Sequence, residues 1–179
     1  MRAASVPTQA STPNFKGVIK PDIRNSTPDW KPFGHKKAPA GAPNFLFVLY
    51  DDTGMAAWSP YGGGINMPTV DKIAANGLSS TNWHTTALCS PTRSTLLTGR
   101  NHHLNGMAGI TEVATGFPGS NGHIPKQCAT IGQLLQDSGY STYWLGKDHN
   151  VPEQDVVSGA SRALWPLGMG FDRFYGFLG

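Results

Sequence analysis

The feature that most restricts how this chain can fold is the run Asn-Phe-Leu-Phe-Val-Leu-Tyr at residues 44–50, followed directly by Asp51 and Asp52. A continuous apolar run of this length is typical of a strand that is buried on both faces, as in a parallel sheet. Ligands of open α/β sheets bind beyond the carboxyl ends of the strands. The run therefore predicts an α/β fold with a mainly parallel sheet, and it places the two carboxylates where a site would lie.

The two carboxylates are costly at this position. Ionised groups at the end of a buried strand are unfavourable unless a cation compensates them. Carboxylate oxygens are the ligands that calcium and magnesium ions prefer. The same pair can also form an ordinary turn or a helix cap, which is a common use of Asp. We interpret Asp51 and Asp52 as ligands of a divalent metal ion, with calcium as the first candidate and magnesium as the second.

A second feature is the pattern Cys89-x-Pro91-x-Arg93 at the predicted start of a helix. Pro91 suits the first helical turn, where its missing N–H costs little, and Gly99 suits the end. Free N–H groups at a helix N-terminus favour an anion, and Arg93 can reach back over the same end. Cys89 would then stand just ahead of an electropositive helix end. The alternative is a buried thiol or a disulfide with Cys128.

Local patterns predict further elements on both sides of the cysteine. Residues 67–77 predict a short helix with a capping glycine at its end, and residues 78–85 predict a strand that leads towards the cysteine. Thr130 and Gln133 form a capping box, which opens a predicted helix over 131–138.

The third predicted strand, residues 140–145, delivers Lys147 and His149 at its carboxyl end. Side chains two residues apart on an extended segment point to the same side. Both groups could therefore donate to one anion. The glycine-rich residues 105–127 predict a long surface loop near the site.

Together these motifs resemble those of the type I sulfatases, the formylglycine-dependent arylsulfatases of the alkaline phosphatase superfamily. The C-x-P-x-R pattern at Cys89, with Thr-Gly-Arg at residues 98–100, resembles their signature. The strand ending in Asp-Asp and the Gly-Lys-x-His that ends at His149 resemble two further elements. Many members have tryptophan where this chain has Asp148. The resemblance spans about residues 42–179 and implies the N-terminal part of an alkaline-phosphatase-like, mainly parallel sheet flanked by helices, incomplete as given.

The resemblance implies hydrolysis of a small-molecule sulfate ester. In the family, a formylglycine-generating enzyme oxidises the signature cysteine, here Cys89, and the hydrated aldehyde is the nucleophile that attacks sulfur. The carboxylate pair and residue 89 would hold Ca2+, or Mg2+ in its place. Arg93 and Lys147 would stabilise the developing charge. His149 would donate a proton or contact the anion, so that Lys147 and His149 also bind the substrate.

The composition of the chain changes near residue 43. Residues 1–43 contain seven prolines and little periodicity, which predicts an extended arm. Residues 44–179 match the N-terminal portion of a sulfatase catalytic domain, because the family's remaining metal and substrate ligands lie further downstream. We therefore expect a truncated chain that is inactive by itself.

The charge and hydropathy of the chain argue against nucleic acid and membrane as partners. The formal net charge is +3, and the basic residues lack the dense face that nucleic-acid binding needs. No apolar run approaches the length of a membrane span, and the N-terminus lacks the apolar centre of a secretory signal. We expect neither nucleic acid nor membrane as a partner. The expected location is cytoplasmic, although a clipped periplasmic or secreted protein would look the same.

Three alternatives remain open at this point. A phosphonate monoester or phosphodiester hydrolase of the same superfamily shares the cysteine pattern and the Asp-rich metal site. The chain could also be a non-catalytic fragment that folds partly, or only with a partner. The third alternative is a binding domain held by a Cys89–Cys128 disulfide.

Overall fold

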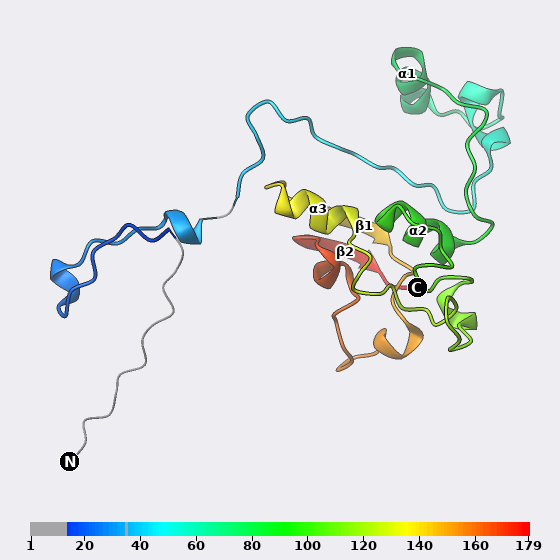
Figure 1. Ribbon diagram of the computed structural model, residues 1–179. Coiled ribbons are helices and arrows are strands. Elements are labelled where there is room, and N and C mark those ends of the chain that lie inside the picture. Colours follow the sequence, from blue (N-terminus) through cyan, green and yellow to red (C-terminus); the bar gives the residue numbers. More distant parts are fainter. Residues whose placement is uncertain (1–13, 35) are drawn as a thin grey trace. The chain divides into compact units, whose positions relative to one another are not determined.

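The computed structural model describes residues 14–34 and 36–179 (Figure 1). The chain divides into two compact units, with the boundary after Lys37. Of the predicted arm, residues 1–13 and 35 lie outside the described residues. The described part of the first unit contains an antiparallel bridge and two short 3₁₀ helices: Val18 with Thr27, then Ile23–Asn25 and Lys31–Phe33.

All residues of the second unit are described, and they form these α-helices and β-strands: α1 Pro68–Asn76, α2 Cys89–Thr98, α3 Ile131–Asp137, β1 Tyr143–Lys147 and β2 Arg173–Phe177. The two strands pair in parallel, with Tyr143 opposite Arg173 and Lys147 opposite Phe177. α2 contacts α3, and both lie near the strands (Figure 1). The unit is thus an incomplete α/β fold with a small parallel sheet, as predicted. None of the helices in the described part of the chain is long and apolar enough to cross a membrane.

α2 forms as its sequence predicts. Pro91 occupies the first turn. Gly99 ends the helix with a φ of +64°, and its N–H donates to the carbonyl of Thr95 at 2.8 Å. Glycine is favoured there because a left-handed backbone strains other residues. One detail differs from the prediction: Cys89 is the first residue of the helix rather than the residue ahead of it. The cysteine therefore belongs to the turn whose N–H groups have no helical partner.

α3 also begins as predicted. The side chain of Thr130 accepts from the N–H of Gln133 at 3.1 Å, and the side chain of Gln133 accepts from the N–H of Thr130 at 2.9 Å. This reciprocal capping box satisfies two N–H groups that the start of a helix leaves unpaired. The helix ends with Asp137, one residue before the predicted end.

The third predicted strand is present but lies further along the chain. β1 covers residues 143–147 rather than 140–145, so Lys147 is its last residue. Its partner β2 lies in the glycine-rich C-terminal stretch, for which the sequence predicted no strand. A Cβ at Gly176 would lie 1.9 Å from the carbonyl oxygen of Gly146. Glycine therefore permits the close backbone approach that this strand pair needs.

The core lies where the sequence predicts a surface loop. Met107, Ile124 and Cys128 are buried and form one cluster. Residues 105–127 thus fold partly inward, and the prediction of a surface loop is wrong for Met107 and Ile124. Hydrogen bonds inside the loop make this burial possible because they satisfy its backbone, as when the N–H of Ala108 donates to the carbonyl of Gly119 at 2.9 Å.

Residues 44–50 are extended but do not form the predicted buried strand. They have no strand partner, and their large side chains are exposed, from 41% for Leu49 to 86% for Leu46. Residues 78–85 likewise form no strand. A strand needs hydrogen bonds to a neighbour as well as a suitable composition, and in the described chain β1 pairs only with β2. Both strand predictions are therefore wrong for this structure.

The extended residues nevertheless run beside the segment that leads into β1. The N–H of Ala38 donates to the carbonyl of Gly139 at 2.9 Å. Further along both segments, the rings of Phe45 and Tyr140 lie 5.8 Å apart. These contacts come in the same order in both segments, so the two segments run in the same direction. The next contact, at the end of β1, belongs to the candidate site.

Candidate active site

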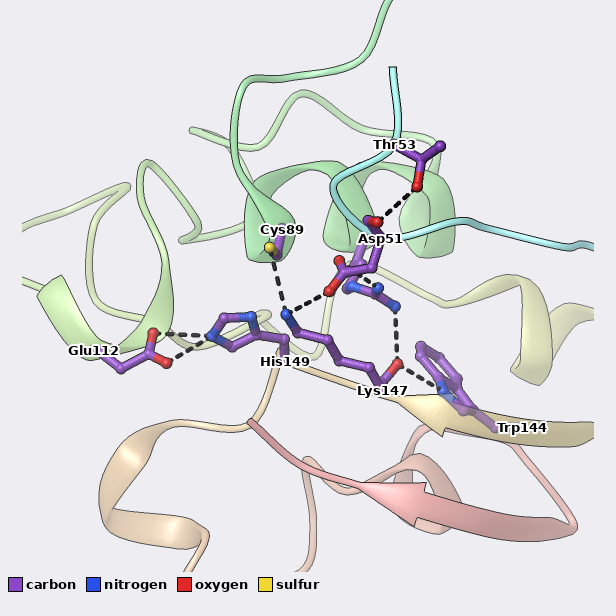
Figure 2. Close-up of polar contacts among 8 residues, drawn as sticks. Asp51, Thr53, Cys89, Glu112, Trp144, Lys147 and His149 are labelled. Carbon is purple, nitrogen blue, oxygen red and sulfur yellow. Dashed lines mark hydrogen bonds and ion pairs between the residues drawn. The ribbon is translucent and has the colours of Figure 1, made fainter. Parts of the chain in front are cut away.

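Side chains from separate segments of the chain meet at the N-terminus of α2 (Figure 2). Cys89 and Arg93 come from the first turns of α2, and Lys147 comes from the end of β1. Asp51 follows the extended residues 44–50. The sequence singled out all four as site residues, and the structure brings them together.

The carboxylate of Asp51 forms ion pairs with two positively charged side chains. Its Oδ1 accepts from Arg93 Nη2 at 3.1 Å, and its Oδ2 accepts from Lys147 Nζ at 2.9 Å. Arg93 Nη1 also donates to the carbonyl oxygen of Lys147 at 2.9 Å. Lys147 and then Arg93 hold the pKa of the Asp51 carboxyl below its usual value, and Asp51 raises the pKa of Lys147. Asp51 and Lys147 are therefore charged near neutral pH.

Cys89 lies against this cluster as a free thiol. Its Sγ lies 3.5 Å from Lys147 Nζ, and its side chain is half-buried. Cys128 is also free and is buried in the core. The alternative of a Cys89–Cys128 disulfide is therefore wrong for this structure.

Asp51, Asp52 and Cys89 form a group that could hold a metal ion. Their ligand atoms all lie within 4.8 Å of one another. Carboxylate oxygen suits a hard cation such as calcium, whereas thiol sulfur suits softer metals. The donor set therefore fits calcium in full only if residue 89 offers an oxygen atom.

His149 lies near this cluster but has a different partner. Its Nε2 lies 2.7 Å and 2.9 Å from the two carboxylate oxygens of Glu112. Lys147 and His149, predicted to face one anion, thus each have a protein partner of their own. Glu112 lies in the 3₁₀ helix Thr111–Val113, 37 positions before the histidine. No motif in the sequence indicates this residue, because it stands in an irregular segment far along the chain.

Glu112 is ionised at neutral pH. Burial alone would raise the pKa of its carboxyl, but its own backbone N–H and His149 act in the opposite direction. The pKa is lowered as a result. Glu112 therefore faces the imidazole as a carboxylate.

Ser90 ties the Glu–His pair to α2. It is fully buried beside Cys89. Its Oγ accepts from the N–H of Thr111 at 3.4 Å, and its carbonyl oxygen accepts from Asn150 Nδ2 at 2.9 Å. In the chain, Thr111 directly precedes Glu112 and Asn150 directly follows His149. The sequence did not indicate this role of Ser90, which depends on residues that are distant in the chain.

Asp148 has a buried carboxyl group and stands between Lys147 and His149 in the chain. It is 2% exposed, and no described residue hydrogen-bonds its Oδ2. Burial raises its pKa to about 7, while the N–H of Asn150 and the charge of Arg93 act against the rise. Asp148 is therefore partly protonated near neutral pH.

Comparison with known proteins identifies the family. The sulfatase family model matches residues 43–179. The chain is 37% identical over 122 residues to an uncharacterized sulfatase of Schizosaccharomyces pombe, covering 64% of this chain and 22% of that protein. It is 36% identical over 141 residues to human steryl-sulfatase, covering 76% of this chain and 24% of that protein. It is 30% identical over 139 residues to the arylsulfatase of Klebsiella aerogenes, covering 76% of this chain and 28% of that protein.

A solved structure has a similar fold. The crystal structure of Ps i-CgsB matches with a TM-score of 0.53 and 30% identity, covering 72% of this chain and 26% of that one. The chain spans about a quarter of the length of the curated relatives named above. Because the family model covers residues 43–179, which is most of the chain, this chain belongs to the sulfatase family.

Proposed function

We propose that this chain contributes the nucleophile and part of the metal site of a sulfuric ester hydrolase. Residues 44–179 are then the N-terminal portion of its catalytic domain, preceded by an extended arm. The observation that carries the proposal is the meeting of Cys89 with Asp51, Arg93 and Lys147 at the start of α2. Similarity to an arylsulfatase and a steryl-sulfatase supports a small-molecule sulfate ester as the substrate.

In this proposal a formylglycine-generating enzyme converts Cys89 to formylglycine. The hydrated aldehyde supplies a hydroxyl nucleophile for sulfur. Of the two cysteines, only Cys89 has proline at the second following position and arginine at the fourth. The neighbouring carboxylates add a chemical argument, since a hard cation prefers oxygen to thiol sulfur at the third ligand position.

Asp51, Asp52 and the oxygen at position 89 are the proposed metal ligands. A calcium ion, or magnesium in its place, would supply Lewis-acid polarisation and charge compensation for a sulfate group. Metal ligands of this kind must be deprotonated. Arg93 and Lys147 favour that state, because both lower the pKa of Asp51.

Arg93 and Lys147 are the proposed charge-stabilising groups. Lys147 Nζ lies 3.5 Å from the Sγ of Cys89, so it can donate to an oxygen that takes the place of the sulfur. The side chain of Arg93 is buried, and charges act more strongly where water is excluded. His149 is the proposed proton-transferring group, with Lys147 and His149 as contacts for the substrate anion.

Production in a host that contains a formylglycine-generating enzyme tests the proposal. Peptide mass spectrometry with an aldehyde-reactive probe should find the aldehyde at Cys89 and a thiol at Cys128. A full-length sulfatase containing this segment should hydrolyse an aryl sulfate and lose that activity in Cys89→Ala. An unmodified Cys89 in such a host contradicts the proposal. Faster turnover of an aryl phosphonate ester than of an aryl sulfate would favour the related hydrolase class.

A polypeptide of residues 1–179 alone should be inactive. The candidate metal group has three donor side chains, whereas calcium binds about six to eight oxygens. Water can complete such a shell, but it does not supply the fixed charge that makes binding tight. Sustained turnover of a chromogenic aryl sulfate by this polypeptide, lost in Cys89→Ala, would contradict the expectation.

A further inference from the structure

We propose that Glu112 is a positioning residue, which holds His149 so that its Nδ1 faces position 89 and the substrate. This role rests on the proposed function and adds a residue that no sequence motif indicates. Three observations carry it: the geometry of the Glu–His contact, the unpartnered second nitrogen of the ring, and the hydrogen bonds of Ser90 to the chain neighbours of both residues.

Glu112 approaches the imidazole at one nitrogen. His149 Nε2 lies 2.7 Å from Oε1 and 2.9 Å from Oε2 of the carboxylate. An ionised carboxylate can only accept hydrogen bonds, so the ring must carry a proton on Nε2. In a neutral ring, Nδ1 is then the acceptor. Glu112 therefore selects one of the two tautomers of His149.

The second nitrogen of the ring has no partner in the described chain. His149 is 6% exposed, and its Nδ1 is buried without a hydrogen bond there. A buried polar atom in this state carries a desolvation cost. Figure 2 shows the ring between Glu112 on one side and Lys147 and Cys89 on the other. The available acceptor is thus on the side of the candidate site, where a hydroxyl group at position 89 would satisfy it.

Ser90 holds both members of the pair next to position 89. Its Oγ accepts from the N–H of Thr111, the neighbour of Glu112, at 3.4 Å. Its carbonyl oxygen accepts from the side chain of Asn150, the neighbour of His149, at 2.9 Å. Ser90 directly follows Cys89, so the hydrogen bonds that place the pair start one residue from the proposed nucleophile.

This arrangement suits proton transfer at Nδ1. A neutral imidazole can take a proton from a hydroxyl group at position 89, and that oxygen keeps the electron pair of the broken O–H bond. The Glu112 carboxylate then stabilises the imidazolium that forms. Without the carboxylate, the ring can carry its proton on either nitrogen and can rotate, so fewer molecules present Nδ1 correctly.

Kinetics of a full-length sulfatase containing this segment tests the role. The variants are Glu112→Gln, Glu112→Asp and the matched control Glu153→Gln, at an exposed glutamate. We expect Glu112→Gln to lower kcat about 100-fold with little change in KM, because a poorly presented base slows proton transfer more than it weakens binding. Glu112→Asp should recover part of the loss. Glu153→Gln should behave as the unmodified enzyme does.

The pH profile distinguishes positioning from a merely structural role. Glu112→Gln removes the carboxylate charge that faces the ring, so the acidic limb of kcat/KM should move to lower pH in this variant. The other ionisable groups of the site are the same in this variant: Asp51, Arg93, Lys147 and Asp148. An unchanged kcat together with an unchanged acidic limb in Glu112→Gln would overturn the proposal.

A measurement without turnover separates this proposal from the proposed function. Nitrogen NMR of isotope-labelled histidines reports the tautomer, and His149→Gln assigns the His149 signals among the six histidines. We expect the Nε2–H form in the unmodified chain and a mixture of tautomers in Glu112→Ala. An Nδ1–H form in the unmodified chain overturns the role of Glu112 even in an active sulfatase. Activity that survives Cys89→Ala would instead contradict the proposed function and leave the tautomer result valid.

Discussion

Residues 44–86 and residues 87–179 differ in how they are packed. No residue of the first stretch is buried, whereas every buried residue of the described chain lies in the second, beginning with Ser90. The first stretch contains the most apolar run of the sequence, yet that run is exposed. The second stretch has a core around Met107, which lies in a glycine-rich loop. Apolar composition alone therefore does not bury a segment, because burial also needs a packing partner.

The candidate site joins the two stretches. The carboxylates of Asp51 and Asp52 belong to the exposed stretch. The remaining groups belong to the packed stretch: Cys89, Arg93, Lys147 and His149. The links are ion pairs of Asp51 with Arg93 at 3.1 Å and with Lys147 at 2.9 Å. The Asp51 side chain is 41% exposed, whereas the side chains of Arg93 and Lys147 are 8% and 17% exposed. The core thus positions the anion-binding half of the site, while charge pairs hold the metal-binding half.

The largest expected effect is a loss of turnover in the anion-binding half of the site, with a loss of metal affinity in the metal-binding half. In a full-length sulfatase containing this segment, Arg93→Ala should lower aryl sulfate turnover about 1000-fold, because it removes a buried charge-stabilising donor. Asp52→Asn should instead lower metal affinity about 100-fold or more, because it deletes a ligand charge. Calcium titration of both variants, beside steady-state kinetics, checks the division. Equal loss of metal affinity in the two variants would show that the roles are assigned wrongly.

A matched pair of truncations tests the difference in packing. Met107 is fully buried and Leu46 is 86% exposed. Met107→Ala should lower the free energy of unfolding by about 3 kcal/mol, because it leaves a cavity in the core. Leu46→Ala should change it by less than about 0.5 kcal/mol, as exposed substitutions usually do. Urea unfolding of the chain compares the two, and a similar loss in both would mean that residues 44–50 are buried in solution.

A pH-dependent effect concerns the cost of a buried carboxyl in the packed stretch. The pKa of Asp148 is raised from 3.8 to about 7 in the folded chain. Between these pH values the folded state keeps a proton that the unfolded chain releases, so stability falls as the pH rises through this window. At about 1.4 kcal/mol per unit of pH, the loss is at most about 4 kcal/mol.

Asp148→Asn should remove most of this pH dependence. We expect the variant to gain about 2 kcal/mol over the unmodified chain near pH 8 and little near pH 4, since an amide is never ionised but its NH2 group would stand where Oδ2 has no described partner. Thermal unfolding at the two pH values measures the gain. An unmodified chain that is equally stable at both would contradict the prediction.

Elements that depend on near neighbours in the chain were predicted well. The capping box of α3 involves only Thr130 and Gln133, and the end of α2 is set by Gly99. Residues within one helical turn decide such features, so the sequence contains the necessary information. The C-x-P-x-R pattern is local in the same sense, which is why it identified the segment that holds Cys89.

Predictions that depend on a distant partner failed more often. The strand expected at residues 44–50 has no hydrogen-bonded neighbour, and the loop expected at the surface in residues 105–127 holds the core. β2 was missed because its aromatic, glycine-rich sequence looks irregular without β1 beside it. In each case the deciding hydrogen bonds or contacts come from residues far away in the chain.

By itself, the sequence determined most chemical groups of the candidate site and the local structure that carries them, including Cys89 near a helix start and Lys147 near the end of a strand. Only the tertiary structure decided which groups meet. The contact of His149 with Glu112 crosses 37 positions of the chain, and the burial of Asp148 depends on the elements that surround it. Such contacts follow from the path of the backbone through space. The order of residues does not reveal that path until the segments have packed.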